Sequence, residues 1–277
     1  MRFKSGSILI LLHFLCFFFN CNCLCGYENF LSGSRSASLS ECSVSSIDLW
    51  SVSNNQAGLA FLENPSVGIY HETKFLLKEL SFNSVGAVIP VKPGTFGFNY
   101  NYFGYSKYHE SKAGLSFGRK LGKKFSAGLQ LDYFSTFITN SENHFPKITF
   151  ELGILSFPVT NLAVGFQVLN PIPEKTENNT EITLPSIMRL GLTYTLHEKI
   201  LLAVETSKDF SKNLILKAGI EYLPVKFFSL RMGIGSGPSQ YSFGIGYSSK
   251  VFLLGIAFTN HPQLGITPHL DIIANFK

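Results

Sequence analysis

The residue types that most often carry catalysis or bind metal are scattered in this chain. No two histidines have the i, i+4 spacing of a helical metal site, and no cysteine lies near His71, His109, His144, His197, His261 or His269. Residues 233–237 are rich in glycine, but no Lys-Ser/Thr pair closes them as a phosphate loop requires, so a turn is predicted there. We expect no metal, no cofactor and no enzymatic activity.

One enzyme class stays open as an alternative. An outer-membrane phospholipase would need a serine, a histidine and an asparagine or aspartate brought together by the fold, and such a triad leaves no local sequence pattern. Nothing in the sequence supports it.

Charged residues placed within otherwise apolar segments are more informative. If these segments are strands of a membrane β-barrel, a charge that faced lipid near the bilayer midplane would cost roughly 2 to 4 kcal/mol. Each of these charged side chains should therefore point to the interior of the barrel. There they could pair with each other, anchor an internal segment or border a path. The residues are Asp132, Glu151, Arg189, Glu205, Lys217, Glu221 and Arg231.

The segments that hold these charges alternate with a period of two residues, which is typical of β-strands rather than helices. In 125–137, large apolar side chains at odd positions oppose Ser, Gly, Gln, Asp and Thr at even positions. The last residues, 270–277, repeat the pattern and indicate a strand that runs to the end of the chain. About fourteen strands are predicted at 66–74, 79–89, 94–105, 111–119, 124–138, 147–156, 161–169, 186–196, 199–207, 213–222, 226–234, 240–248, 250–258 and 268–277.

Composition favours a membrane barrel over a soluble β-sandwich. Charged residues are only 15% of the chain and aromatic residues 14%, whereas a soluble protein carries about 25% charged residues. The less apolar face of the predicted strands consists mainly of Gly, Ser, Thr, Asn and Gln, which suits a water-filled barrel interior. The predicted fold is all-β: a transmembrane antiparallel up-and-down β-barrel, with an N-terminal hatch or plug.

The predicted connections sort by length. Turns after even-numbered strands are short, whereas several after odd-numbered strands are long, notably 139–146, 170–185 and 259–268. Outer-membrane barrels show this asymmetry, with short turns and both termini in the periplasm. The net charge of +5 is mild and its basic residues are dispersed, so no nucleic-acid partner is expected.

The N-terminus has the layout of a signal peptide. Arg2 and Lys4 precede an apolar run from Ile8 to Phe19, which is too short for a transmembrane helix. We predict a signal peptide at 1–25, a hatch at 26–65 and a barrel at 66–277. Cleavage would leave Cys42 as a lone thiol; acylation of Cys21, Cys23 or Cys25 is an alternative, although Asn or Leu precedes each of them.

The proposed hatch carries a family resemblance. Residues 33–38 and 48–60 resemble the opening of PorV/PorQ-type outer-membrane proteins of Bacteroidetes, relatives of the FadL long-chain fatty acid transporters, although Gln56 stands where the family has Pro. The hatch motif comprises Arg35, Asn54, Asn55, Ala57, Gly58, Leu59 and Ala60. The resemblance implies a fourteen-stranded barrel with a hatch, and a role in moving hydrophobic compounds or in type IX secretion.

The expected function is transport of hydrophobic small molecules across the outer membrane of a Gram-negative bacterium. Phe103 and Phe134 are candidates for an apolar ligand pocket. An accessory barrel that binds a secretion-system protein and a mainly structural closed barrel remain alternatives. Outer-membrane lipid and the barrel assembly machinery are expected partners, with Phe276 as the assembly signal.

Overall fold

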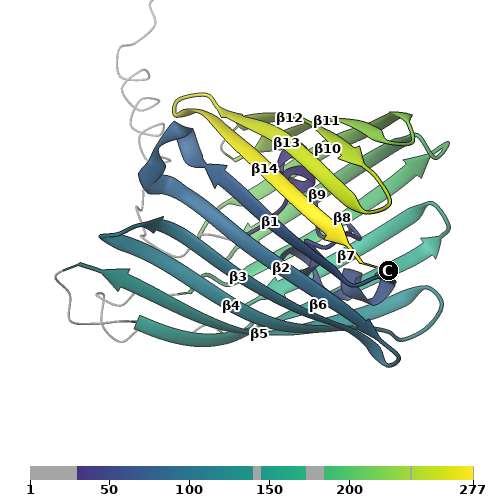
Figure 1. The fold of residues 1–277 in the computed structure, drawn as a ribbon, viewed down its shortest axis with the longest axis horizontal. Coiled ribbons are helices and arrows are strands. Elements are labelled where there is room, and N and C mark those ends of the chain that lie inside the picture. Colours follow the sequence, from purple (N-terminus) through teal and green to yellow (C-terminus); the bar gives the residue numbers. More distant parts are fainter. Residues whose placement is uncertain (1–29, 140–144, 173–183, 238, 277) are drawn as a thin grey trace, which may run out of the picture.

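The computed structural model describes residues 30–139, 145–172, 184–237 and 239–276, and the predicted signal peptide lies outside them. Fourteen antiparallel strands form one closed barrel, in which each strand pairs with its sequence neighbours and β1 pairs with β14 (Figure 1). The predicted barrel of fourteen strands is therefore confirmed. The strands are β1 (Ser66–Thr73), β2 (Ser81–Val91), β3 (Gly94–Tyr105), β4 (Tyr108–Lys120), β5 (Phe125–Ile138), β6 (Phe145–Val159), β7 (Leu162–Leu169), β8 (Ile187–Leu196), β9 (Ile200–Asp209), β10 (Leu214–Val225), β11 (Phe228–Ser236), β12 (Ser239–Ser248), β13 (Phe252–His261) and β14 (Gly265–Asn275).

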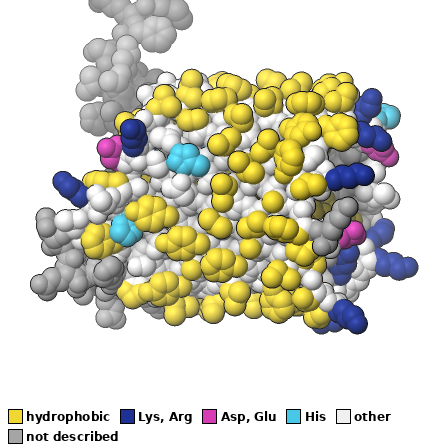
Figure 2. Space-filling model, in the orientation of Figure 1, with side chains coloured by type: hydrophobic (Ala, Val, Ile, Leu, Met, Phe, Trp, Pro, Cys, Tyr) yellow, Lys and Arg dark blue, Asp and Glu magenta, His cyan; other side chains and the backbone are white. Residues whose placement is uncertain are grey.

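The alternating pattern sets which side of the wall each residue occupies. Along β5, Leu129, Leu131 and Tyr133 are exposed on the outside, whereas Gln130 and Asp132 are fully buried inside. The outer surface is accordingly a broad band of apolar side chains (Figure 2). None of the helices in the described ranges is long and apolar enough to cross a membrane.

The connections between strands depart from the expected sorting at one place. The segment 259–268 is not a long loop: β13 runs to His261 and β14 begins at Gly265, so three residues connect them. His261 and Gly265 still pair in the ladder, and the polar Thr259 and Thr267 pair within it. The polarity of residues 259–268 suggested a loop, but the β13–β14 ladder continues through these polar residues.

Residues 30–65 lie inside the barrel. They form short helical turns, α2 (Ser34–Ser38), α3 (Ser51–Asn54) and η1 (Gln56–Phe61), which contact β2–β6 and β11–β14 from within. The remaining helical turns, η2 (Lys74–Leu76) and η3 (Lys78–Leu80), connect β1 to β2. We call residues 30–65 the inner segment.

The two ends of the described chain lie at opposite ends of the barrel. Phe30 stacks on Phe82 at the start of β2, near the β1–β2 connection. Asn275 pairs with Ser66, where the short turns gather (Figure 1). We call these the loop end and the turn end. The inner segment therefore runs through the interior from the loop end to the turn end before β1 begins.

Candidate functional site

Glycines on the inner wall make room for the inner segment. A Cβ atom at Gly165 would lie 2.1 Å from the Val44 carbonyl oxygen, and one at Gly128 would lie 2.3 Å from the Gln56 carbonyl carbon. Both distances are far below van der Waals contact, so any larger residue would displace backbone. The sequence suggested a wet interior face at these positions, but the structure fills it with protein.

The hatch-motif residues do not form one contact surface: Ala57 to Ala60 lie in η1, which packs on β4, β5 and β6, whereas Arg35 lies in α2, which packs on β11–β14. Asn55 accepts a hydrogen bond from the Ala57 N–H at 3.1 Å and donates to the carbonyls of Val44 at 2.6 Å and Ile154 at 3.1 Å. The Asn54 side chain makes two hydrogen bonds to the backbone of Ser32: its Oδ1 accepts from the Ser32 N–H, and its Nδ2 donates to the Ser32 carbonyl. Ala57, Gly58 and Leu59 are buried, and Ala60 is partly buried.

Gln56 makes a contact that the proline of the resembled family could not make. Its Nε2 donates to Glu151 Oε2 at 2.7 Å, and the side chain is fully buried. The departure from the family pattern thus joins the inner segment to a charged residue of the wall.

Glu151 belongs to a buried cluster on β4–β7. Lys112 is ion-paired with both Glu151 and Asp132, the latter at 3.4 Å. Gln130 donates to Asp132 at 2.7 Å and Gln167 donates to Glu151 at 2.7 Å. Buried charges require such partners, because an unpaired one carries a large desolvation cost.

A second cluster ties the inner segment to β8 and β9. Arg189 pairs with Glu205 at 2.7 Å and donates to the Asn54 carbonyl at 2.8 Å. The other Glu205 oxygen accepts the backbone N–H groups of Ser43 at 2.8 Å and Val44 at 2.9 Å. One ion pair of the wall therefore satisfies three backbone groups of the inner segment.

Arg35 of α2 pairs with an acidic residue of the wall and with one of the inner segment. Its guanidinium lies 2.7 Å from Glu221 of β10 and 3.4 Å from Asp48, and Glu221 also pairs with Arg231 at 2.8 Å. The Glu221 carboxylate raises the pKa of Arg35 above its usual value. On the other side of the same turn, Ser34 donates to Asp271 of β14 at 2.5 Å.

The surroundings also shift the pKa values of two further groups of the inner segment, Glu41 and Cys42. Burial would raise the pKa of Glu41, but the Lys217 ammonium 2.6 Å away holds that pKa below its usual value. Burial, followed by the nearby Glu205 carboxylate, raises the pKa of the Cys42 thiol to about 12. The Cys42 thiol is therefore protonated at neutral pH and shielded from reagents.

A cavity of about 220 Å³ opens toward the loop end. One side is aromatic and is formed by Phe30, Phe75, Phe82 and Phe103. Of the two residues predicted for an apolar ligand pocket, Phe103 lines this cavity, whereas Phe134 packs against Phe30 without lining it. The Lys74 ammonium lies 5.4 Å from the centre of the Phe103 ring.

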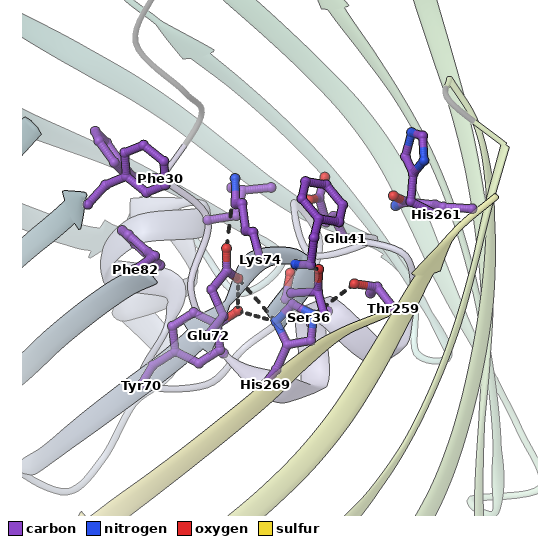
Figure 3. A pocket seen from close by; sticks show the side chains of 17 residues that line it. Phe30, Ser36, Glu41, Tyr70, Glu72, Lys74, Phe82, Thr259, His261 and His269 are labelled. Carbon is purple, nitrogen blue, oxygen red and sulfur yellow. Dashed lines mark hydrogen bonds and ion pairs between the residues drawn. The ribbon is translucent and has the colours of Figure 1, made fainter. Parts of the chain in front are cut away.

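The other side of this cavity is polar (Figure 3). The Tyr70 hydroxyl donates to Glu72 at 2.5 Å and lies 2.7 Å from His269 Nδ1, and His269 Nε2 lies 2.9 Å from the Thr259 hydroxyl. Ser36 also lines the cavity, and its buried hydroxyl has no hydrogen-bond partner among the described residues. The cavity therefore offers an aromatic wall and a hydrogen-bonding wall.

A second cavity, of about 460 Å³, opens toward the turn end. Its lining includes Leu223, Lys226 and Phe227 at the β10–β11 turn, together with Trp50 and Arg35 of the inner segment. Gly33 and Ser36 border the first cavity, whereas Arg35 borders the second. The single turn α2 therefore stands between the two.

All seven predicted charged residues are on the inner side of the wall. The structure gathers them into three sets: Asp132 and Glu151 with Lys112, Arg189 and Glu205 with Lys217 nearby, and Glu221 with Arg231. Phe276 is half exposed beyond β14, where its N–H donates to Pro65 at 2.8 Å.

Sequence reasoning missed several inward residues: Glu41, Trp50, Tyr70, Glu72, Lys112, Asp271 and His269. Lys112 and Asp271 carried a usable signal, since both occupy the inward register of predicted strands. Trp50 and Glu41 lie in a segment without alternation, where no pattern indicates direction.

Metal-binding and catalytic arrangements were also sought. Within the described ranges, no group of three His, Cys, Asp or Glu side chains could hold a metal ion. In the same residues, no histidine shares a hydrogen bond with a serine hydroxyl of the kind that a phospholipase triad needs.

Neither a protein-family model nor a curated protein matches this chain. Solved structures match it closely in shape. The toluene transporter TbuX of Ralstonia pickettii aligns with a TM-score of 0.71 at 10% identity, covering 92% of this chain and 99% of that one. The CymD monoaromatic hydrocarbon channel gives 0.68 at 11% identity, covering 91% and 99%, and a Pseudomonas aeruginosa FadL homologue gives 0.66 at 10%, covering 89% and 98%. The chain therefore has the fold of these three barrels.

Proposed function

We propose that this protein is an outer-membrane barrel that carries hydrophobic small molecules from the loop end to the turn end. The observation that carries the proposal is the pair of cavities on opposite sides of α2. An aromatic-walled cavity can hold an apolar body, and displacement of the five-residue turn α2 would join the two cavities. The mainly structural alternative gives no reason for a half-aromatic cavity at the loop end.

The location follows from the surface. An apolar band around a closed barrel is stable in a bilayer, where every backbone group of the wall is satisfied by a neighbouring strand. The proposed orientation has the turn end in the periplasm, with Phe276 available to the assembly machinery. The hydrocarbon channels that share this fold support transport as the role.

The type IX secretion alternative has less support. It needs extended loops as a docking surface for a protein partner, and one of its three candidate segments, 259–268, is mostly strand. The segments 139–146 and 170–185 fall largely outside the described residues. A pull-down from detergent extract that recovers the barrel alone, with normal secretion in a deletion strain, would reject this alternative.

Ligand binding tests the transport proposal directly. Purified barrel titrated with a fluorescent long-chain fatty acid, and separately with toluene, should give saturable binding to at least one of them. Replacement of Phe103 by Trp should weaken binding by filling the cavity, whereas the same change at Phe98, which faces outward, should not. Absence of a saturable signal with either ligand would sink the proposal.

A further inference from the structure

We propose that lysines on the short turns form a headgroup-binding ring for anionic phospholipids of the membrane leaflet at the turn end. The basic ring is defined as Lys92, Lys123, Lys199, Lys226 and Lys250, one from each of five turns. All five are exposed, and no described side chain forms an ion pair or hydrogen bond with them. This inference rests on the proposed membrane location but goes beyond transport.

Charge is strongly biased on these turns. The six short connections together contain six lysines and one acidic residue, Glu198. The charged side chains inside the barrel are, by contrast, largely paired with opposite charges. On the face that Figure 2 shows, Lys and Arg side chains are denser at the turn-end edge of the apolar band than at the opposite edge, with a few Asp or Glu side chains among them. The short turns are therefore predominantly basic.

The residues beside the lysines favour a lipid over a soluble partner. Exposed apolar side chains sit next to the basic ring in the sequence: Val91 precedes Lys92, Phe227 follows Lys226 and Val251 follows Lys250. An apolar group that enters the acyl region beside a cation at phosphate level is the arrangement that suits a membrane interface. A soluble acidic protein would need the cations without the adjoining apolar groups.

The ring also follows most of the perimeter of the barrel mouth. Because consecutive strands are neighbours around the barrel, the five turns are distributed around its mouth. Only the β6–β7 turn, Thr160-Asn161, lacks a basic residue. Lipid headgroups surround a barrel on all sides, whereas a single protein partner would need a patch on one side.

The test compares lipid binding to the full chain in detergent by native mass spectrometry. Dioleoylphosphatidylglycerol and dioleoylphosphatidylcholine are titrated against wild-type protein, against Lys92→Gln/Lys123→Gln/Lys250→Gln, and against a matched control, Lys78→Gln/Lys107→Gln/Lys212→Gln, at the loop end. We expect wild-type protein and the control to bind the anionic lipid preferentially. The preference should fall by roughly tenfold in the ring variant, and it should weaken in high salt.

Three results would overturn the proposal: no preference in wild-type protein, an unchanged preference in the ring variant, or an equal loss in both triple variants. Binding of polyglutamate that the ring variant loses, without any lipid preference, would assign the ring to an acidic protein instead. The fatty acid and toluene titrations on the same samples separate the two proposals. Lipid preference without ligand binding removes transport alone, and ligand binding without lipid preference removes the ring alone.

Discussion

The indole Nε1 of Trp50 donates a hydrogen bond of 2.8 Å to Oδ2 of Asp271. This bond joins the inner segment to β14, the last strand of the barrel. The other Asp271 oxygen accepts from Ser34, so one carboxylate holds both α2 and the tryptophan. Closure of the barrel and placement of the inner segment therefore share a residue.

Loss of the Trp50–Asp271 bond should loosen the inner segment without opening the barrel. Trp50→Phe removes the donor and keeps most of the ring, and it should cost about 1.5 to 3 kcal/mol because the acceptor is charged and buried. Urea unfolding followed by circular dichroism measures this cost. Tyr247→Phe on the wall is the control, and an equal loss of stability in both variants would contradict the assignment.

Disruption of the Arg35–Glu221 pair should expose Cys42. Arg35→Met removes one partner of a largely buried ion pair, which favours displacement of α2. In a background with the four leader cysteines changed to serine, maleimide labelling of Cys42 should be slow in the parent and at least tenfold faster in the variant. Lys78→Met is the control, and equal labelling rates would show that Arg35 does not hold the inner segment.

Inward glycines should tolerate no side chain where the inner segment touches them. Gly165→Val would drive a side chain into the Val44 carbonyl, and we expect a loss of about 1 to 3 kcal/mol or failure to assemble. Gly235→Ala is the control, because its nearest neighbour is the flexible Gln240 side chain at 3.2 Å. Heat-modifiable migration on gels reports assembly. Normal assembly and stability of Gly165→Val would refute the close packing.

The charge of the ligand can be read from the pH dependence of binding. Burial lowers the pKa of Lys74 to about 8, so this ammonium is charged below that pH and neutral above it. Binding of a fatty acid anion should therefore be stronger at pH 7 and weaken as the pH rises through 8, whereas binding of toluene should not change. Titrations at pH 7 and pH 9.5 measure this, with Lys74→Gln as the pH-insensitive comparison. A fatty acid affinity that is equal at both pH values would exclude Lys74 from the site.

Deletion of residues 270–277 should block assembly. These residues pair with β1 on one side and β13 on the other, so their loss leaves two strand edges open. Heat-modifiable, folded barrel from the deletion would refute this prediction. Replacement of Lys277 alone should have little effect.

The sequence alone determined the barrel and the direction of most wall residues. Alternation with a period of two is a local property, so it predicted strands such as β3 and β5 at the observed residues. It also predicted that Glu151 and Arg189 point inward, because the outer surface is apolar and a charge there is costly. Strand ends were less certain where polar residues continue the ladder, as at Thr259.

The tertiary structure alone decided how the interior is arranged. The partners of Asp271 lie 221 and 237 residues away, and no local pattern links such distances. The glycines of the inner face could not be interpreted from the sequence for the same reason. A glycine there is compatible with a water-filled interior and with a closely packed backbone. The terminal strand shows both levels: alternation revealed its apolar face at 270, 272 and 274, but only the closed fold brings the intervening Asp271 to Trp50 and Ser34.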